Sequence, residues 1–116
     1  MREASSNFAE VRFIDRDQIL RELRRAVADA KARYPEIAAV YLFGSLAQGT
    51  WTADSDADLF VVVRRVFKTF SESCQYQIYS HSIPTDSLVY SEADFERLRR
   101  DPSSLVSSNL ASAIEL

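Results

Sequence analysis

The sequence predicts one small domain that combines helices with β-strands. An amphipathic helical pattern precedes Pro35, and two short apolar segments, at 37–43 and 58–64, have the length of buried strands. A third apolar segment follows Pro84 and leads into further helical patterns. With 116 residues, 47% of them hydrophobic and 27% charged, the chain has the size and composition of a single globular domain.

The first helix is expected to begin at Asp15 and to end before Pro35. The Asp15 side chain can accept hydrogen bonds from the first free N–H groups of a helix, and Pro35 prevents its continuation. Residues 1–13 form a lead-in with no assigned element, in an expected domain of residues 1–116. The apolar face of the helix recurs at helical spacing and consists of Ile19, Leu20, Leu23, Val27 and Ala30.

Two strands are expected next, at 37–43 and 58–64, joined by a turn or a short helix at 45–55. The second strand is apolar on both faces and should therefore lie centrally in a sheet. After it, a helix is favoured because apolar residues step by three and four, at Phe67, Phe70, Cys74 and Ile78.

A strand at 75–80 is the alternative to that helix, because Tyr76 and Ile78 also alternate. Cys74 carries no signature of a nucleophile, and we expect it to be a small buried hydrophobe. As the only cysteine, it excludes an internal disulfide and fits a reducing compartment.

A third strand is expected at 85–90, followed by two helices. Ser91 can cap the first of them, and Phe95 supplies part of its apolar face. Asp101-Pro102 ends that helix, and Pro102 can occupy the first turn of a last helix. The chain stops inside this last helical pattern, which indicates a truncated helix or a partner that covers it. The apolar positions of the last helix are Leu105, Val106, Leu110 and Ile114.

Charge and hydropathy exclude several classes of function. The net charge of −3 argues against broad nucleic-acid binding, which requires a basic face. The longest apolar run, at 59–63, is far too short to span a membrane. No signal peptide is recognisable, so the expected location is the cytoplasm.

The two glycines of the chain, Gly44 and Gly49, flank a short segment directly after the first strand. Glycine allows a sharp turn and a close approach of the backbone to a ligand. The Ser45 hydroxyl and the amides after it could then donate hydrogen bonds to phosphate oxygens. The segment is not a P-loop, because it has no Gly-Lys-Ser/Thr sequence.

Two aspartates, Asp56 and Asp58, stand at the beginning of the second strand. Residues two apart in a strand project from the same face, and two like charges there are costly unless they share a cation. Mg²⁺ prefers such hard oxygen ligands. Asp86, at the start of the third strand, is the acidic residue placed to be a third ligand. Three carboxylates could hold two metal ions about 3.5–4 Å apart, and Asp86 could also serve as a general base.

These residues together resemble the signature of the nucleotidyltransferase superfamily typified by DNA polymerase beta. The resemblance covers nearly the whole chain and is closest to the minimal nucleotidyltransferases, small prokaryotic proteins often paired with a HEPN-domain partner. It implies an α+β fold, with a small mixed β-sheet and helices packed mainly on one face. The residues that carry it are Gly44-Ser45, Gly49, Ser55-Asp56, Asp58-Leu59 and Asp86.

The resemblance also implies an activity, the transfer of a nucleoside monophosphate from a nucleoside triphosphate with release of pyrophosphate. By position, Asp56 and Asp58 would be the paired metal ligands and Asp86 the third carboxylate. Gly44 and Ser45 would hold the nucleotide phosphates, with Gly49 and Ser55 completing this part of the site. The chain departs from the family at Gln48, where a basic residue is frequent, and at Thr85, where an apolar residue is common.

The leading hypothesis is therefore a Mg²⁺-dependent nucleotidyltransferase, with ATP as the favoured donor and a partner protein as the acceptor. Some minimal nucleotidyltransferases resemble antitoxins that modify a tyrosine of a HEPN toxin with AMP. One alternative is an antitoxin that neutralises its partner by occupancy alone. Another is a small-molecule transferase similar to aminoglycoside-modifying enzymes, which normally carry an additional helical domain. Base preference, the acceptor and an oligomeric state stay open.

Overall fold

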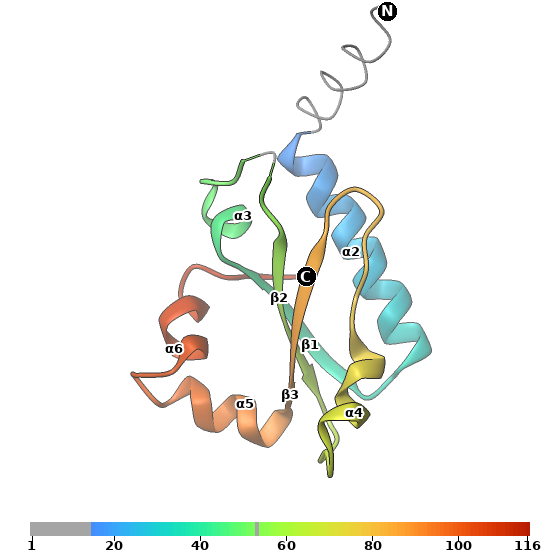
Figure 1. Ribbon diagram of the computed structural model, residues 1–116, viewed down its shortest axis with the longest axis vertical. Coiled ribbons are helices and arrows are strands. Elements are labelled where there is room, and N and C mark those ends of the chain that lie inside the picture. The colour runs from blue at the N-terminus through green and yellow to red at the C-terminus, as the bar shows by residue number, and fades with distance from the viewer. Residues whose placement is uncertain (1–14, 53) are drawn as a thin grey trace, which may run out of the picture.

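The computed structural model describes residues 15–52 and 54–116 of the chain. The lead-in expected at residues 1–13 lies outside the described residues. No helix in the described ranges is both long enough and apolar enough to cross a membrane. A four-stranded mixed sheet, in the order β3-β2-β1-β4, forms the centre of the domain (Figure 1).

The sheet contains antiparallel and parallel pairs. The two central strands, β1 and β2, pair antiparallel, while β3 lies parallel to β2 and the short β4 lies antiparallel to β1. The α+β class and the mixed sheet implied by the sequence are therefore confirmed. The strands are β1 (Ile37–Phe43), β2 (Ala57–Val63), β3 (Thr85–Ser91) and β4 (Ile114–Glu115).

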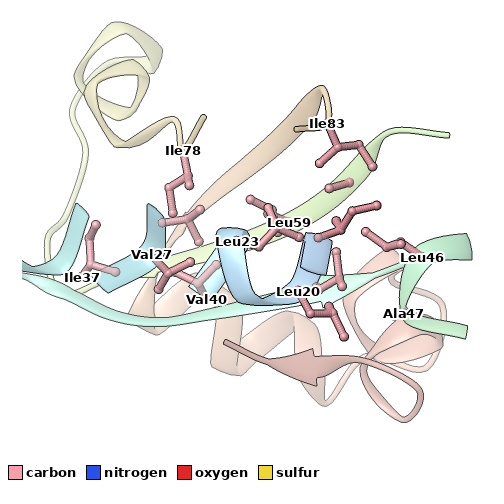
Figure 2. Packing of buried hydrophobic residues seen from close by; sticks show 14 of the residues in the cluster. Leu20, Leu23, Val27, Ile37, Val40, Leu46, Ala47, Leu59, Ile78 and Ile83 are labelled. Atoms are coloured by element: carbon pink, nitrogen blue, oxygen red, sulfur yellow. The ribbon is translucent and has the colours of Figure 1, made fainter. Parts of the chain in front are cut away.

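The long helix α2 (Arg16–Arg33) covers one face of the sheet, as expected from its apolar periodicity. Its N-cap is Asp15, whose carboxylate accepts a hydrogen bond of 2.7 Å from the Gln18 N–H. Figure 2 shows the core between this helix and the sheet, with side chains of both meeting in one cluster. The helix contributes Ile19, Leu20, Leu23 and Val27, and the two central strands contribute Ile37, Val40, Leu42, Leu59, Val61 and Val63.

Two shorter helices, α5 (Glu92–Arg99) and α6 (Leu105–Leu110), cover the other face. Their core is aromatic, with the rings of Phe43 and Phe60 stacked at a centroid distance of 3.9 Å and Phe95 packed edge-on against Phe60. Ser91 caps α5 as expected, by accepting a hydrogen bond from the Asp94 N–H. The helices are thus divided between the two faces more evenly than the resemblance implied.

The helix expected from Phe67 to Ile78 is wrong in extent. Only α4 (Phe70–Ser73) and a 3₁₀ turn, η1 (Cys74–Tyr76), form, and the alternative strand at 75–80 is absent from this described segment. The chain leaves η1 in an extended conformation because side chains of β3 bind it there. The Ile78 N–H donates to the Ser87 hydroxyl, and the Thr85 hydroxyl donates to the Ile78 carbonyl. Tyr76 and Ile78 are buried, but Cys74 is exposed, contrary to expectation.

The last helix also ends earlier than expected. Its N-cap is Ser104 rather than a residue beside Pro102, and Ile114 lies in β4 instead of extending the helix. Edge pairing explains the difference, because residues 114 and 115 pair with Tyr41 and Leu42 of β1 and the Leu116 N–H donates to the Val40 carbonyl at 2.9 Å. The described chain therefore finishes on a strand and not inside a truncated helix.

Candidate functional site

Two of the three predicted carboxylates lie side by side at one end of the sheet. Asp58 and Asp86 are direct partners in the parallel register of β2 and β3. Further along the same strands, Phe60 and Leu88 are also partners, and both belong to the core on the α5–α6 face. Because side chains alternate along a strand, Asp58 and Asp86 project from this same face. Asp56 directly precedes β2, two residues before Asp58.

The charges of the other two aspartates act on Asp58. Burial raises the pKa of the Asp58 carboxyl above its ordinary value, and the negative charges of Asp86 and Asp56 raise it further. Asp56 and Asp86 are themselves exposed, whereas Asp58 is half-buried. The three residues therefore interact electrostatically, and the ionised form of Asp58 is disfavoured.

No three acidic, histidine or cysteine side chains in residues 15–52 and 54–116 lie close enough together to hold one metal ion. The three aspartates lie at the same end of the sheet, and the charges of Asp56 and Asp86 act on Asp58. They do not form a preassembled cluster of three metal ligands. Their donor set nevertheless fits a hard divalent cation, since Mg²⁺ is usually bound by one or two carboxylates together with substrate phosphates. A cation there would relieve the repulsion that raises the pKa of Asp58. Their assignment as metal ligands stays a prediction.

Gly44 brings the end of β1 against the Asp58 carboxylate. Its φ of 82° and ψ of −157° lie in a region that is essentially reserved for glycine. A Cβ atom at this position would lie 2.6 Å from Asp58 Oδ2. Glycine is therefore needed at this position for two reasons, the backbone conformation and the space that the Asp58 carboxylate occupies.

The segment after Gly44 is ordered by its own hydrogen bonds. Residues Ser45–Gln48 form the short helix α3, which Gly49 ends in a left-handed conformation with φ of 82°. Ser45 and Ser55, from the two halves of the predicted motif, meet with their hydroxyl oxygens 3.4 Å apart. The Ser55 hydroxyl also accepts a hydrogen bond of 2.9 Å from the Thr52 N–H. Gly44, Ser45, Ser55 and Asp58 thus lie close together in the structure.

Arg16 is a residue of this region that the sequence did not reveal. It is the first residue of α2, and its guanidinium donates to the carbonyls of Leu46 and Ala47 in α3, at 2.8 and 3.0 Å. A single arginine in the first turn of an amphipathic helix carries no signal of such a contact, because its partners are backbone atoms about thirty positions away.

A family model for the nucleotidyltransferase domain matches residues 20–105, well over half of the chain. The chain belongs to this nucleotidyltransferase family. The matched range contains Gly44, Ser45, Asp56, Asp58 and Asp86, whereas Arg16 lies before it. Nucleotidyltransferases of this family use a nucleoside triphosphate and a divalent metal ion, and nucleotidyl transfer is the general activity that membership supports.

A solved structure supports the nucleotidyltransferase fold independently. It is a crystal structure from Sulfolobus solfataricus, of a protein proposed to be a nucleotidyltransferase. It superposes with a TM-score of 0.52 at 22% sequence identity, over 67% of this chain and 74% of that one. A search of curated proteins gives no significant match.

The two departures from the nucleotidyltransferase pattern have different surroundings. Thr85 donates its hydroxyl to the Ile78 carbonyl, so a polar residue here holds the 77–83 segment against β3. Gln48 is exposed at the end of α3. A groove of about 570 Å³ lies elsewhere, between α2 and residues 77–81, and none of the predicted site residues lines it.

The raised pKa of Asp58 predicts how this carboxyl titrates in the nucleotidyltransferase without metal. Because burial and the neighbouring negative charges favour its protonated form, Asp58 should take up its proton at a higher pH than an ordinary aspartate, whose pKa is about 3.9. Removing one neighbouring charge in Asp86→Asn should lower the pKa again. Carbon-13 NMR of the carboxyl resonances between pH 3 and 7 measures both values. An Asp58 pKa unaffected by Asp86→Asn would contradict the interaction.

Proposed function

We propose that this chain catalyses metal-dependent transfer of a nucleoside monophosphate, AMP from ATP in the favoured case, to a hydroxyl group on a partner protein. The observation that carries the proposal is the meeting of Gly44 with Asp58, which is paired in turn with Asp86. The segment proposed to bind phosphates therefore lies beside the carboxylates, at one end of the two central strands. Membership of the nucleotidyltransferase family supports the reaction class.

Asp56 and Asp58, with Asp86, are the residues that would hold the metal. When bound, a divalent ion neutralises triphosphate charge and favours departure of pyrophosphate. The backbone after Gly44 would bind and orient phosphate oxygens. The Ser45 hydroxyl, which donates to the Ser55 hydroxyl in this structure, would turn its proton to the phosphate. Asp58 must be ionised to hold the metal, although burial, together with the charges of Asp86 and Asp56, raises its pKa.

Asp86 is proposed as the general base of the transfer. The acceptor oxygen would form a bond to the α-phosphorus of the nucleotide while its proton passes to the Asp86 carboxylate. The bond from the α-phosphorus to the bridging oxygen breaks, and pyrophosphate leaves. Asp86 suits this role because it is exposed, whereas its partner Asp58 is half-buried.

A protein acceptor is favoured by the openness of this edge. Asp56 and Asp86 are both exposed to solvent. A second macromolecule could therefore bring its hydroxyl directly to the carboxylates. The finer proposal is a tyrosine of a HEPN-type toxin, encoded beside this chain, with the chain acting as its antitoxin in the cytoplasm.

The test uses ATP labelled on the α-phosphate, Mg²⁺ and the product of the neighbouring gene. We expect the label to enter the partner with release of one pyrophosphate per label, while ATP labelled on the γ-phosphate gives no labelled protein. Asp29→Asn, at an exposed position on α2, is the matched control and should label as the wild type does. An unlabelled partner, under conditions where the two proteins bind, would overturn the proposal.

A further inference from the structure

Arg16 fixes the far end of the segment that begins with Gly44. Its Nε and Nη2 atoms donate to the Leu46 and Ala47 carbonyls, so both arms of the guanidinium fork are used on consecutive residues. The last carbonyls of a helix have no partner within the helix, and a positive charge near them interacts favourably with the helix dipole. Arg16 therefore caps α3 from another element.

In the part of the chain that the structure describes, few other side chains hold the solvent side of α3. Leu46 and Ala47 are buried in the core, but Gln48, Gly49 and Thr50 are exposed. The Ser45 carbonyl accepts from both the Gly49 and Thr50 N–H groups, which leaves the next two carbonyls to Arg16. Among the described residues, Arg16 supplies the only cationic side chain that hydrogen-bonds residues 44–49.

We propose that Arg16 is a positioning residue for nucleotide binding: by fixing α3, it holds Gly44 and Ser45 in the conformation that receives the phosphates. This inference rests on the proposed function. Gly44 and Ser45 begin the segment whose carbonyls Arg16 binds, and the Gly44 backbone also abuts the Asp58 carboxylate. A shift of α3 would therefore displace the groups proposed to bind the phosphates and weaken nucleotide binding. Arg16 itself contacts backbone and is not assigned to the reacting atoms.

Arg16→Met tests this role, because it keeps most of the aliphatic stem and removes the charge and the donors. Since the phosphates are bound in the ground state and the transition state alike, the KM for ATP should rise about tenfold while kcat changes by less than about threefold. In Arg16→Lys the KM for ATP should lie between those of the wild type and Arg16→Met. An ammonium group can reach one carbonyl but cannot bind both as the guanidinium does. Arg24→Met, at an exposed position of the same helix, is the matched control.

Hydrogen exchange without nucleotide separates this inference from the proposed function. In Arg16→Met, amides 46–50 should exchange about tenfold faster than in the wild type and in Arg24→Met, while amides of β1 and β2 keep their rates. If the wild type transfers no nucleotide but this local change occurs, the proposed function fails and the positioning contact stands. Unchanged exchange at 46–50, a KM equal to the wild type, or a loss of kcat and of sheet protection together would overturn the inference.

Discussion

Asp58→Asn is expected to reduce nucleotidyl transfer at least about a thousandfold and, at the same time, to stabilise the protein. The loss of activity follows from the removal of a proposed metal ligand, and a thousandfold change corresponds to about 4 kcal/mol of transition-state stabilisation. The gain in stability follows from the repulsion at this edge, because burial and the charges of Asp86 and Asp56 disfavour the ionised form of Asp58 in the folded protein.

The sign of the stability effect depends on pH. A carboxyl whose pKa is raised in the folded state favours folding while it is protonated, and this contribution is lost as pH rises through the folded pKa. At neutral pH the wild type therefore bears the full penalty, and Asp58→Asn removes it. We expect the melting temperature at pH 7.5 to rise by only about 2–3 °C, because solvent screens part of the repulsion at this half-buried carboxyl.

Melting curves of the wild type and Asp58→Asn between pH 4 and 8 measure this effect, and the difference should shrink toward the acidic end. Asp29→Asn, at an exposed position on α2, should change neither the melting temperature nor the transfer rate appreciably. An Asp58→Asn protein that retained transfer would contradict the proposed ligand role. One that melted below the wild type at neutral pH would contradict the repulsion.

Gly44→Ala is expected to destabilise the fold by about 2–4 kcal/mol and to abolish measurable transfer. Alanine at the Gly44 dihedral angles is strained by about 1–3 kcal/mol. In addition, its Cβ would lie 2.6 Å from Asp58 Oδ2, so either β1 or the carboxylate has to move. Urea unfolding and the labelled-ATP assay measure the two effects.

Gly49→Ala is a close control for Gly44→Ala. Both glycines have a φ of 82°, but Gly49 has the ordinary left-handed ψ of 10° and a Cβ there would meet nothing within 4 Å. Its substitution should therefore cost only the left-handed backbone strain, about 1–2 kcal/mol. Equal losses of stability at the two positions would show that neither the Asp58 contact nor the ψ of −157° at Gly44 adds to the cost.

A double-mutant cycle isolates the contact itself. In an Asp58→Ala background the obstructing carboxylate is absent, so Gly44→Ala should cost about 1 kcal/mol less than it does in the wild type. The residual cost is then the backbone strain. Strict additivity of the two substitutions would exclude the direct contact between Gly44 and Asp58.

The parts of the fold that local signals determine could be predicted from the sequence. The strand at 37–43 has its predicted bounds, and α2 begins behind Asp15 and ends before Pro35 as its cap and proline require. These elements agree because turn chemistry, apolar periodicity and burial all favour the same structure. The pairing of Asp58 with Asp86 follows from two such strands lying parallel.

The parts that distant partners determine could not be predicted. Residues 75–80 carry an ambiguous apolar pattern, and the backbone of Ile78 within them is bound by the hydroxyl groups of Thr85 and Ser87. Ile114 continues a helical spacing, but it pairs with Leu42 of β1 and forms part of β4. Arg16 had no recognisable signal because it binds main-chain carbonyls, which no sequence pattern displays.

A shifted pairing of β2 and β3 would be energetically costly. A slip of one residue would turn every side chain of β3 to the opposite face. Asp86 would then point toward the aliphatic core under α2, where an unpaired carboxylate is costly, and Val89 would turn away from that core. The alignment that creates the site is therefore also the one that keeps its charge in water. Asp86 therefore contributes both to the proposed site and to the correct pairing of β3 with β2.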